Sequence, residues 1–123
     1  KKLEFIHINK TSALIKASIK MGAVLAGAKE KDLMLLDKYA HNIGLAFQIA
    51  DDILDVYADK RLLGKNGSDK DNDKLTYLSL YGKEKSEENA KNLIIEAKEK
   101  IAKFKSKKEI LEAIADYMID RKF

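Results

Sequence analysis

The segment from Tyr39 to Ala58 contains no Lys, Arg or Glu, although 36% of the whole chain is charged. A segment that is apolar on most of its sides predicts a helix at the centre of a bundle. Asp51, Asp52 and Asp55 nevertheless lie within it. Carboxylates are rarely buried without a partner, and several within about one helical turn repel one another. Because no basic side chain nearby in sequence compensates them, we expect a bound divalent cation to do so.

The rest of the chain predicts an all-α fold. It has no proline to interrupt long helices, and glycines mark the joints between them. A polar loop is expected over about 60–74, and the small residues near Gly22 and Gly27 would let another helix approach closely. In the last helix, burial is expected for Ile110, Leu111, Ile114, Ala115 and Met118. Helices are predicted over about 11–28, 31–58, 76–80, 86–104 and 108–121.

Composition excludes several classes of protein. The 24 Lys and Arg against 20 Asp and Glu give a net charge of +4. The basic residues form no clustered arm with interleaved aromatics, so nucleic-acid binding is not expected. There is no cysteine for a disulfide or a thiolate metal site. Without an apolar run of membrane-spanning length or a signal peptide, no membrane span and a cytoplasmic location are expected.

One face of the central helix is predicted to be polar. Gln48, Asp51, Asp52 and Asp55 are spaced three or four residues apart, and we call them the aspartate patch. Gly44 clears space one turn earlier. Mg²⁺ characteristically takes one or two protein carboxylates and keeps water and phosphate oxygens as its other ligands. The alternative is a solvated stripe. It is disfavoured because Asp is a poorer helix former than the Glu and Lys used on the other surface faces.

A second acidic cluster superficially resembles a calcium loop. It begins at Asp69 and continues through Asp71 and Asp73. Its sixth position is Lys74 rather than Gly, and its twelfth is Leu80 rather than Glu. The segment is therefore interpreted as a mostly solvated loop.

Three further strings stand out in order along the chain: IHINKT at Ile6–Thr11, FQIADDILD at Phe47–Asp55, and a segment from Gly64 to Tyr77 with the pattern GK…G…D…KLTY. These motifs resemble IHxxKT, the second aspartate-rich motif FQxxDDxxD and GK…G…D…KxTY of the trans-isoprenyl diphosphate synthases, the polyprenyl synthetase family. The basic ending Arg121–Lys122 is also similar. The resemblance covers essentially all of residues 1–123 and is nearest to bacterial farnesyl or geranyl diphosphate synthases.

The resemblance implies a transferase with an isoprenoid-synthase-type helical bundle. It would condense isopentenyl diphosphate with an allylic diphosphate, dimethylallyl or geranyl, to give a farnesyl-type diphosphate. Mg²⁺ would assist ionisation of the allylic substrate, since the leaving diphosphate must be neutralised.

The resemblance also implies a role for individual residues. Metal binding falls to Asp51, Asp52 and Asp55. Thr11 and Gln48 would present oxygens to the developing carbocation, and Phe47 would contact the isopentenyl chain. The diphosphate would be bound by Lys10, Lys65 and Lys74, and the site covered by Arg121 and Lys122.

Simpler interpretations stand beside these roles. His7 is better interpreted as a packing or capping residue than as a catalyst. Apart from the motif order, Lys65 and Lys74 would be ordinary solvated lysines, and Phe47 could be plain core. Arg121 and Lys122 could be a frayed terminus that is favourable to the helix dipole.

Two features depart from the family pattern. Leu78 replaces the usual Pro after KxTY, which is expected to alter the entry into the following helix without touching the chemistry. The first aspartate motif, with its following arginines, is absent from this chain. The chain also opens at Lys1 without an initiator Met. We therefore expect it to be the C-terminal portion of a longer single domain, inactive alone and needing the N-terminal half.

Two other functions compete with this one. A non-catalytic helical subunit would keep the fold for assembly, but it would have no need of Lys10, Thr11 and the aspartate patch. A terpene cyclase of related architecture is disfavoured by the KT and GK…KxTY motifs. The resemblance also implies a homodimer. A separate N-terminal half is expected to dock on the small residues from Gly22 to Gly27 or across the aspartate patch.

Overall fold

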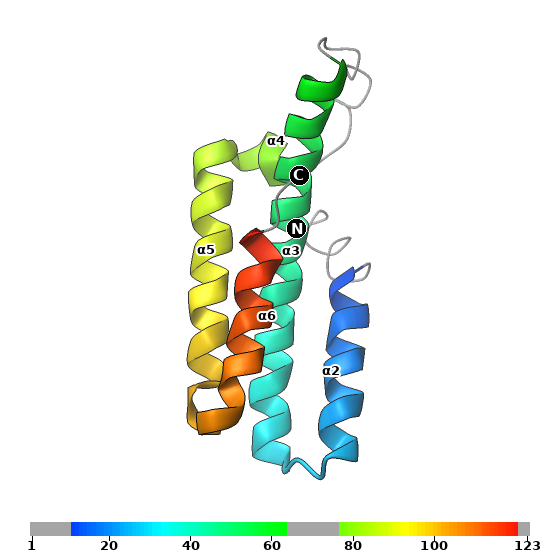
Figure 1. Ribbon diagram of the computed structural model, residues 1–123, viewed down its shortest axis with the longest axis vertical. Helices are drawn as coiled ribbons and strands as arrows, with labels where there is room; N and C mark the ends of the chain where they lie inside the picture. Colours follow the sequence, from blue (N-terminus) through cyan, green and yellow to red (C-terminus); the bar gives the residue numbers. More distant parts are fainter. Residues whose placement is uncertain (1–10, 64–76, 121–123) are drawn as a thin grey trace.

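The computed structural model describes residues 11–63 and 77–120, and within them every regular element is a helix. Helix α3, Glu30–Leu63, is the longest and stands at the centre of the bundle (Figure 1). It contacts α2, α4, α5 and α6. The other elements are α2 Ala13–Leu25, α4 Tyr77–Tyr81, α5 Lys83–Lys100, η3 Ala102–Lys107 and α6 Lys108–Asp120. The predicted all-α fold and the central position of the apolar helix are confirmed.

The apolar face of α3 forms the core. Its core residues recur every three or four positions, the period of one helix face. They face α5 and α6, whose own buried residues include Ile94, Ala97 and Ala115. Burial of this kind is the main source of stability for helices, which are marginal in isolation. The α3 residues in the core are Tyr39, Ile43, Ala46, Ile49 and Ile53.

Helix α2 lies antiparallel beside the first half of α3 and covers it on one side only (Figure 1). It ends at Leu25, and in the turn that follows Gly27 has a φ of 82°, a left-handed conformation that glycine adopts without penalty. Ile15 and Ile19 pack against the core, yet α2 itself contains no fully buried residue. Its outer side is apolar and uncovered, with Leu14, Met21, Val24 and Leu25 all more than half exposed.

Gly22, in α2, and Gly27, just after it, have nothing packed where a side chain would stand, among the described residues. A Cβ built on Gly22 would meet nothing within 4 Å. The close approach of another helix that these residues predict is therefore not made by residues 11–63 or 77–120.

Helix α6 packs through a narrower face than the sequence predicts. Ala115 is fully buried, and Leu111 and Met118 pack against the core, as expected. The expected burial of Ile110 and Ile114 is wrong, because their side chains are 72% and 39% exposed. Helix α6 has α3 and α5 on one side only, and with Tyr117 these two isoleucines form an uncovered apolar stripe.

Two helix boundaries differ from the sequence prediction. Helix α3 continues to Leu63, so residues 60–63, predicted as the start of a loop, are helical. Helix α5 ends at Lys100 rather than near 104, and the chain then turns through η3. In that turn Lys105 adopts φ 54° and ψ −121°, a conformation more usual for glycine. The other boundaries, including the break at Gly82, lie close to prediction.

Membrane insertion of the described helices has no support in their composition. Across residues 11–63 and 77–120, no helix combines the length and the apolar content that crossing a bilayer requires.

Candidate functional site around the aspartate patch

The aspartate patch lies on the second half of α3, beyond the level at which α2 begins. Gln48 is buried, with 8% of its surface exposed. Asp51 and Asp52 are half-buried and Asp55 is exposed. The expectation that an apolar interior encloses these carboxylates is therefore wrong, because two of them are only partly buried and the third is exposed. The patch lies on the side of α3 that is turned away from α5 and α6, whereas the neighbouring Ile53 is buried in the core.

The donor set suits a hard cation. Carboxylate oxygens are preferred Mg²⁺ ligands, and half-exposed carboxylates leave room for water and phosphate oxygens. None of the three carboxylates is without an interaction partner. Among the described residues no three Asp, Glu or His side chains converge as a ready cluster of ligands. The arrangement therefore suits a cation held by one or two carboxylates rather than an all-protein cage.

The N-terminal end of α2 is seated directly on α3, one turn before Gln48. Thr11 and Ser12 form a single wide turn ahead of α2, Thr11 half-buried and Ser12 fully buried. Ser12 lies so close to Gly44 that any side chain there would clash: a Cβ on Gly44 would stand 2.6 Å from Ser12 Oγ. The space that Gly44 was predicted to clear is thus filled by Ser12. The sequence offered no sign that Ser12 was its partner.

Of the remaining predicted site residues, the structure describes Phe47, and the others lie outside the described residues. Phe47 is half-buried on α3, which is compatible with a ligand contact and with packing. The predictions that lie outside the described residues concern His7, Lys10, Lys65, Lys74, Arg121 and Lys122.

The opposite side of α3 is fixed to the bundle by two side-chain hydrogen bonds. The Tyr39 hydroxyl donates to the Leu111 carbonyl oxygen on α6 at 2.5 Å. The Asn42 amide donates to the Glu96 carboxylate on α5 at 3.2 Å. Burial, aided by the negative charge of Asp116, raises the pKa of Tyr39 well above its ordinary value, so this hydroxyl remains a donor. These bonds help to fix the helix that carries the patch.

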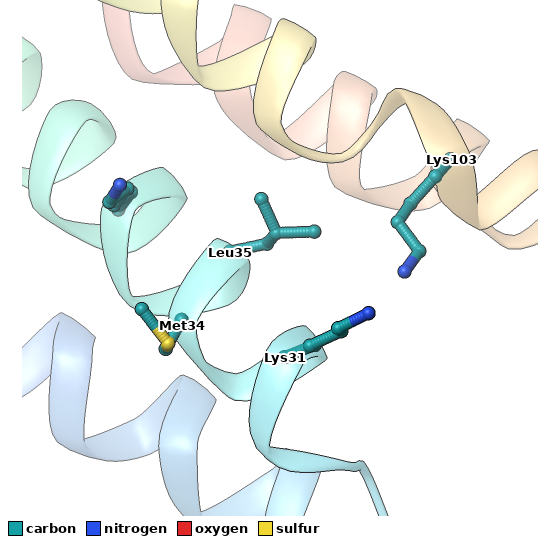
Figure 2. Close-up of a pocket in the computed structure, with 5 residues that line it drawn as sticks. Lys31, Met34, Leu35 and Lys103 are labelled. Carbon is teal, nitrogen blue, oxygen red and sulfur yellow. The ribbon is translucent and has the colours of Figure 1, made fainter.

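A pocket of 270 Å³ lies at the other end of α3 (Figure 2). It is lined by Lys31, Met34, Leu35 and Lys38 of α3 and by Lys103 of η3. At a rise of about 1.5 Å per residue, Lys38 is about 20 Å along the helix from Asp51. Lys103 Nζ is also 3.0 Å from a carboxylate oxygen of Asp32, so part of its charge is already compensated. This basic pocket is separate from the aspartate patch.

A pocket of 310 Å³ lies nearer to the patch but on another side of α3. It is lined by residues of α3, α5 and α6, among them Ile53, Ala90 and Ile119. Its α3 residues, Ala50, Ile53 and Leu54, are not those of the aspartate patch. It lies between packed helices, whereas the patch faces away from them.

An all-α bundle whose central helix carries FQIADDILD is characteristic of one class of helical proteins, and comparison identifies it. The polyprenyl synthetase family model matches residues 1–117, so the chain belongs to that family. A geranylgeranyl diphosphate synthase from Cyanophora paradoxa is 51% identical over 120 residues. A farnesyl diphosphate synthase from Escherichia coli is 46% identical over 124 residues.

A solved structure supports the same relationship. The apo structure of an FPP/GFPP synthase from Zymomonas mobilis superposes with a TM-score of 0.80 at 33% sequence identity. The match covers 94% of this chain and 36% of that one. The two sequence matches each cover 97% of this chain, but 40% and 42% of the relatives' lengths. The chain thus spans about two fifths of the length of these relatives.

Proposed function

We propose that this chain is the C-terminal portion of a short-chain prenyl diphosphate synthase. The complete enzyme would condense isopentenyl diphosphate with an allylic diphosphate to give a farnesyl-type product. The proposal rests mainly on the aspartate patch, a family motif that is partly exposed on the central helix α3. Relatives named farnesyl and geranylgeranyl diphosphate synthases support the class of substrate.

The residues of this chain would act through position and charge. Asp51 and Asp52 would hold Mg²⁺, and Asp55 would support them. When bound, the metal supplies positive charge that stabilises the departing diphosphate. Thr11 and Gln48 would direct oxygen atoms at the positive charge that develops on the allylic carbon. Lys10, Lys65 and Lys74 would bind diphosphate, Phe47 would contact the isopentenyl chain, and Arg121 would help to exclude water.

The uncovered apolar surfaces support the proposal that further protein completes the domain. Helix α2 exposes Leu14, Met21 and Leu25, and α6 exposes Ile110 and Tyr117. Contiguous apolar surface of this kind commonly marks an interface. We propose that the N-terminal half of the same enzyme covers it, and that the complete protein forms a homodimer in the cytoplasm. A non-catalytic subunit would expose similar surfaces, so activity must decide between the two.

The test uses the complete protein with both diphosphates and Mg²⁺, and it compares two substitutions on α3. We expect Asp51→Asn to lower kcat at least about 100-fold, because the loss of a carboxylate would weaken the hold on the Mg²⁺ that stabilises the departing diphosphate. Asp37→Asn is the control: Asp37 is exposed and pairs with Lys16 at 3.6 Å, so kcat should be unchanged.

Each outcome has a meaning. Equal rates for wild type and Asp51→Asn would remove Asp51 from the site. No condensation by the wild type would favour the non-catalytic subunit. The 123-residue chain alone is expected to show no turnover, and turnover would contradict the need for an N-terminal half.

A further inference from the structure

We propose that Gly44 is a positioning residue. Because Gly44 has no side chain, Ser12 packs directly against α3, and this contact fixes the position of Thr11 relative to Gln48. This inference rests on the proposed function for the roles of Thr11 and Gln48. The contact between Ser12 and Gly44 is itself a feature of the described structure and can be tested without measuring activity.

The contact between Ser12 and Gly44 leaves no room for a methyl group. A Cβ on Gly44 would lie 2.6 Å from Ser12 Oγ, 2.9 Å from Ser12 Cβ and 3.0 Å from Ser12 Cα. Rotation of the Ser12 hydroxyl would relieve only the first of these distances. The other two are fixed by the backbone of the turn before α2, so that whole turn would have to move.

Close packing, rather than a hydrogen bond, holds Ser12 against Gly44. Ser12 is fully buried, and among residues 11–63 and 77–120 its hydroxyl finds no hydrogen-bond partner. A buried hydroxyl without a partner is unfavourable, so polar bonding does not explain why the turn lies so close to α3. Close packing against the bare backbone of Gly44 does explain it.

The contact between Ser12 and Gly44 matters for the site because Thr11 and Gln48 lie on either side of it. Thr11 precedes Ser12 in the same turn, and Gln48 lies one helical turn beyond Gly44. In the proposed reaction both present oxygens to the same developing charge, yet they come from different helices. The contact at Gly44 is thus one residue from Thr11 and one helical turn from Gln48. A displacement of about 1 Å can lower a rate about 100-fold.

The test compares Gly44→Ala with Asp37→Asn in the complete enzyme. Both positions lie on α3, but Asp37 is exposed and lies about 10 Å along the helix from Gly44. We expect Gly44→Ala to lower kcat at least about tenfold. The KM for isopentenyl diphosphate should change less than about threefold, because Thr11 acts on charge present only in the transition state. Asp37→Asn should keep the wild-type kcat and KM.

A compensating change separates positioning from general damage. In Gly44→Ala/Ser12→Gly the two shortest clashes disappear and only the 3.0 Å approach to Cα remains. We expect this double variant to recover most of the kcat lost by Gly44→Ala, with single Ser12→Gly as the reference. An unchanged kcat in Gly44→Ala would overturn the proposal. Failure of the double variant to recover kcat would also overturn it.

Hydrogen exchange keeps the test independent of catalysis. Gly44→Ala should speed amide exchange in the first turn of α2 and leave the core of α5 protected, and the double variant should restore the protection. If Gly44→Ala does not fold, recovery of folding in the double variant supports the role of this contact and continued misfolding refutes it. If the wild type condenses no substrate, the proposed function fails, while the exchange result still decides whether Gly44 seats Ser12.

Discussion

Replacing Tyr39 with phenylalanine tests how α6 is fixed to the central helix. The ring of Tyr39 is fully buried, and its hydroxyl donates to the Leu111 carbonyl oxygen at 2.5 Å. Tyr39→Phe keeps the ring and removes only this donor. The net loss for such a bond is about 1 kcal/mol of unfolding free energy at pH 7. For a domain of this size that lowers Tm by about 4 °C.

The pH dependence of this difference is a sharper test. Because burial raises the pKa of Tyr39 in the folded protein above its ordinary 10.0, the folded state excludes the tyrosinate. The stabilisation is therefore fully present below pH 10 and is lost as the pH rises above it, where the unfolded chain ionises. At 1.36 kcal/mol per pH unit, wild type loses about 1.4 kcal/mol from this group by pH 11. Tyr39→Phe cannot lose it.

The two proteins should therefore converge. Denaturant unfolding at pH 7, 9, 10 and 11 should show wild type more stable by about 1 kcal/mol at the first two values and no more stable at pH 11. The titration of lysines and other tyrosines is common to both proteins and cancels in the difference. A gap that stays constant from pH 7 to 11 would refute the raised pKa. No gap at pH 7 would show that the hydrogen bond contributes nothing.

Two further predictions concern neighbouring residues with opposite environments. Ile94→Ala should cost about 2–5 kcal/mol of unfolding free energy because Ile94 is 3% exposed in the core, whereas Ile95→Ala, 55% exposed, should cost less than about 1 kcal/mol, as measured by denaturant unfolding. Equal costs would contradict the described orientation of α5. Lys105→Gly should raise Tm, corresponding to about 1 kcal/mol, because glycine tolerates φ 54°, while Ala102→Gly in the same turn should lower it. A lower Tm for both would show that Lys105 is not strained.

The central helix was predictable because its pattern is long and strong. Many apolar residues between Tyr39 and Ile53 fall at helical spacing, so one period explains both the helix and its buried face. The same spacing correctly placed Gln48 and the three aspartates on one face. Their degree of burial was not predictable, because it depends on which elements from elsewhere in the chain pack beside that face.

The errors have equally local causes. The end of α5 was misplaced because the turn contains neither glycine nor proline, and Lys105 instead adopts a positive φ. The burial of Ile110 and Ile114 was overpredicted because helical spacing shows which residues share a face, and not how wide a face the neighbours cover. The pairing of Ser12 with Gly44 joins residues on different helices, and periodicity within one helix carries no information about it.

One face of α3 packs against α5 and α6, and the opposite face carries the aspartate patch. Substitutions on the two faces should therefore have different effects. The face carrying Tyr39 and Ile43 is held by α5 and α6 through a continuous core, so changes there should appear first as lost stability. The aspartate patch gains its fixed position from that core, because a site on a rigid helix inherits the helix's precision. Thr11 adjoins Ser12, whose close contact with Gly44 fixes the start of α2 on this helix. A small shift at that contact displaces Thr11 without disturbing the core, and its cost should therefore be measured in rate more than in Tm.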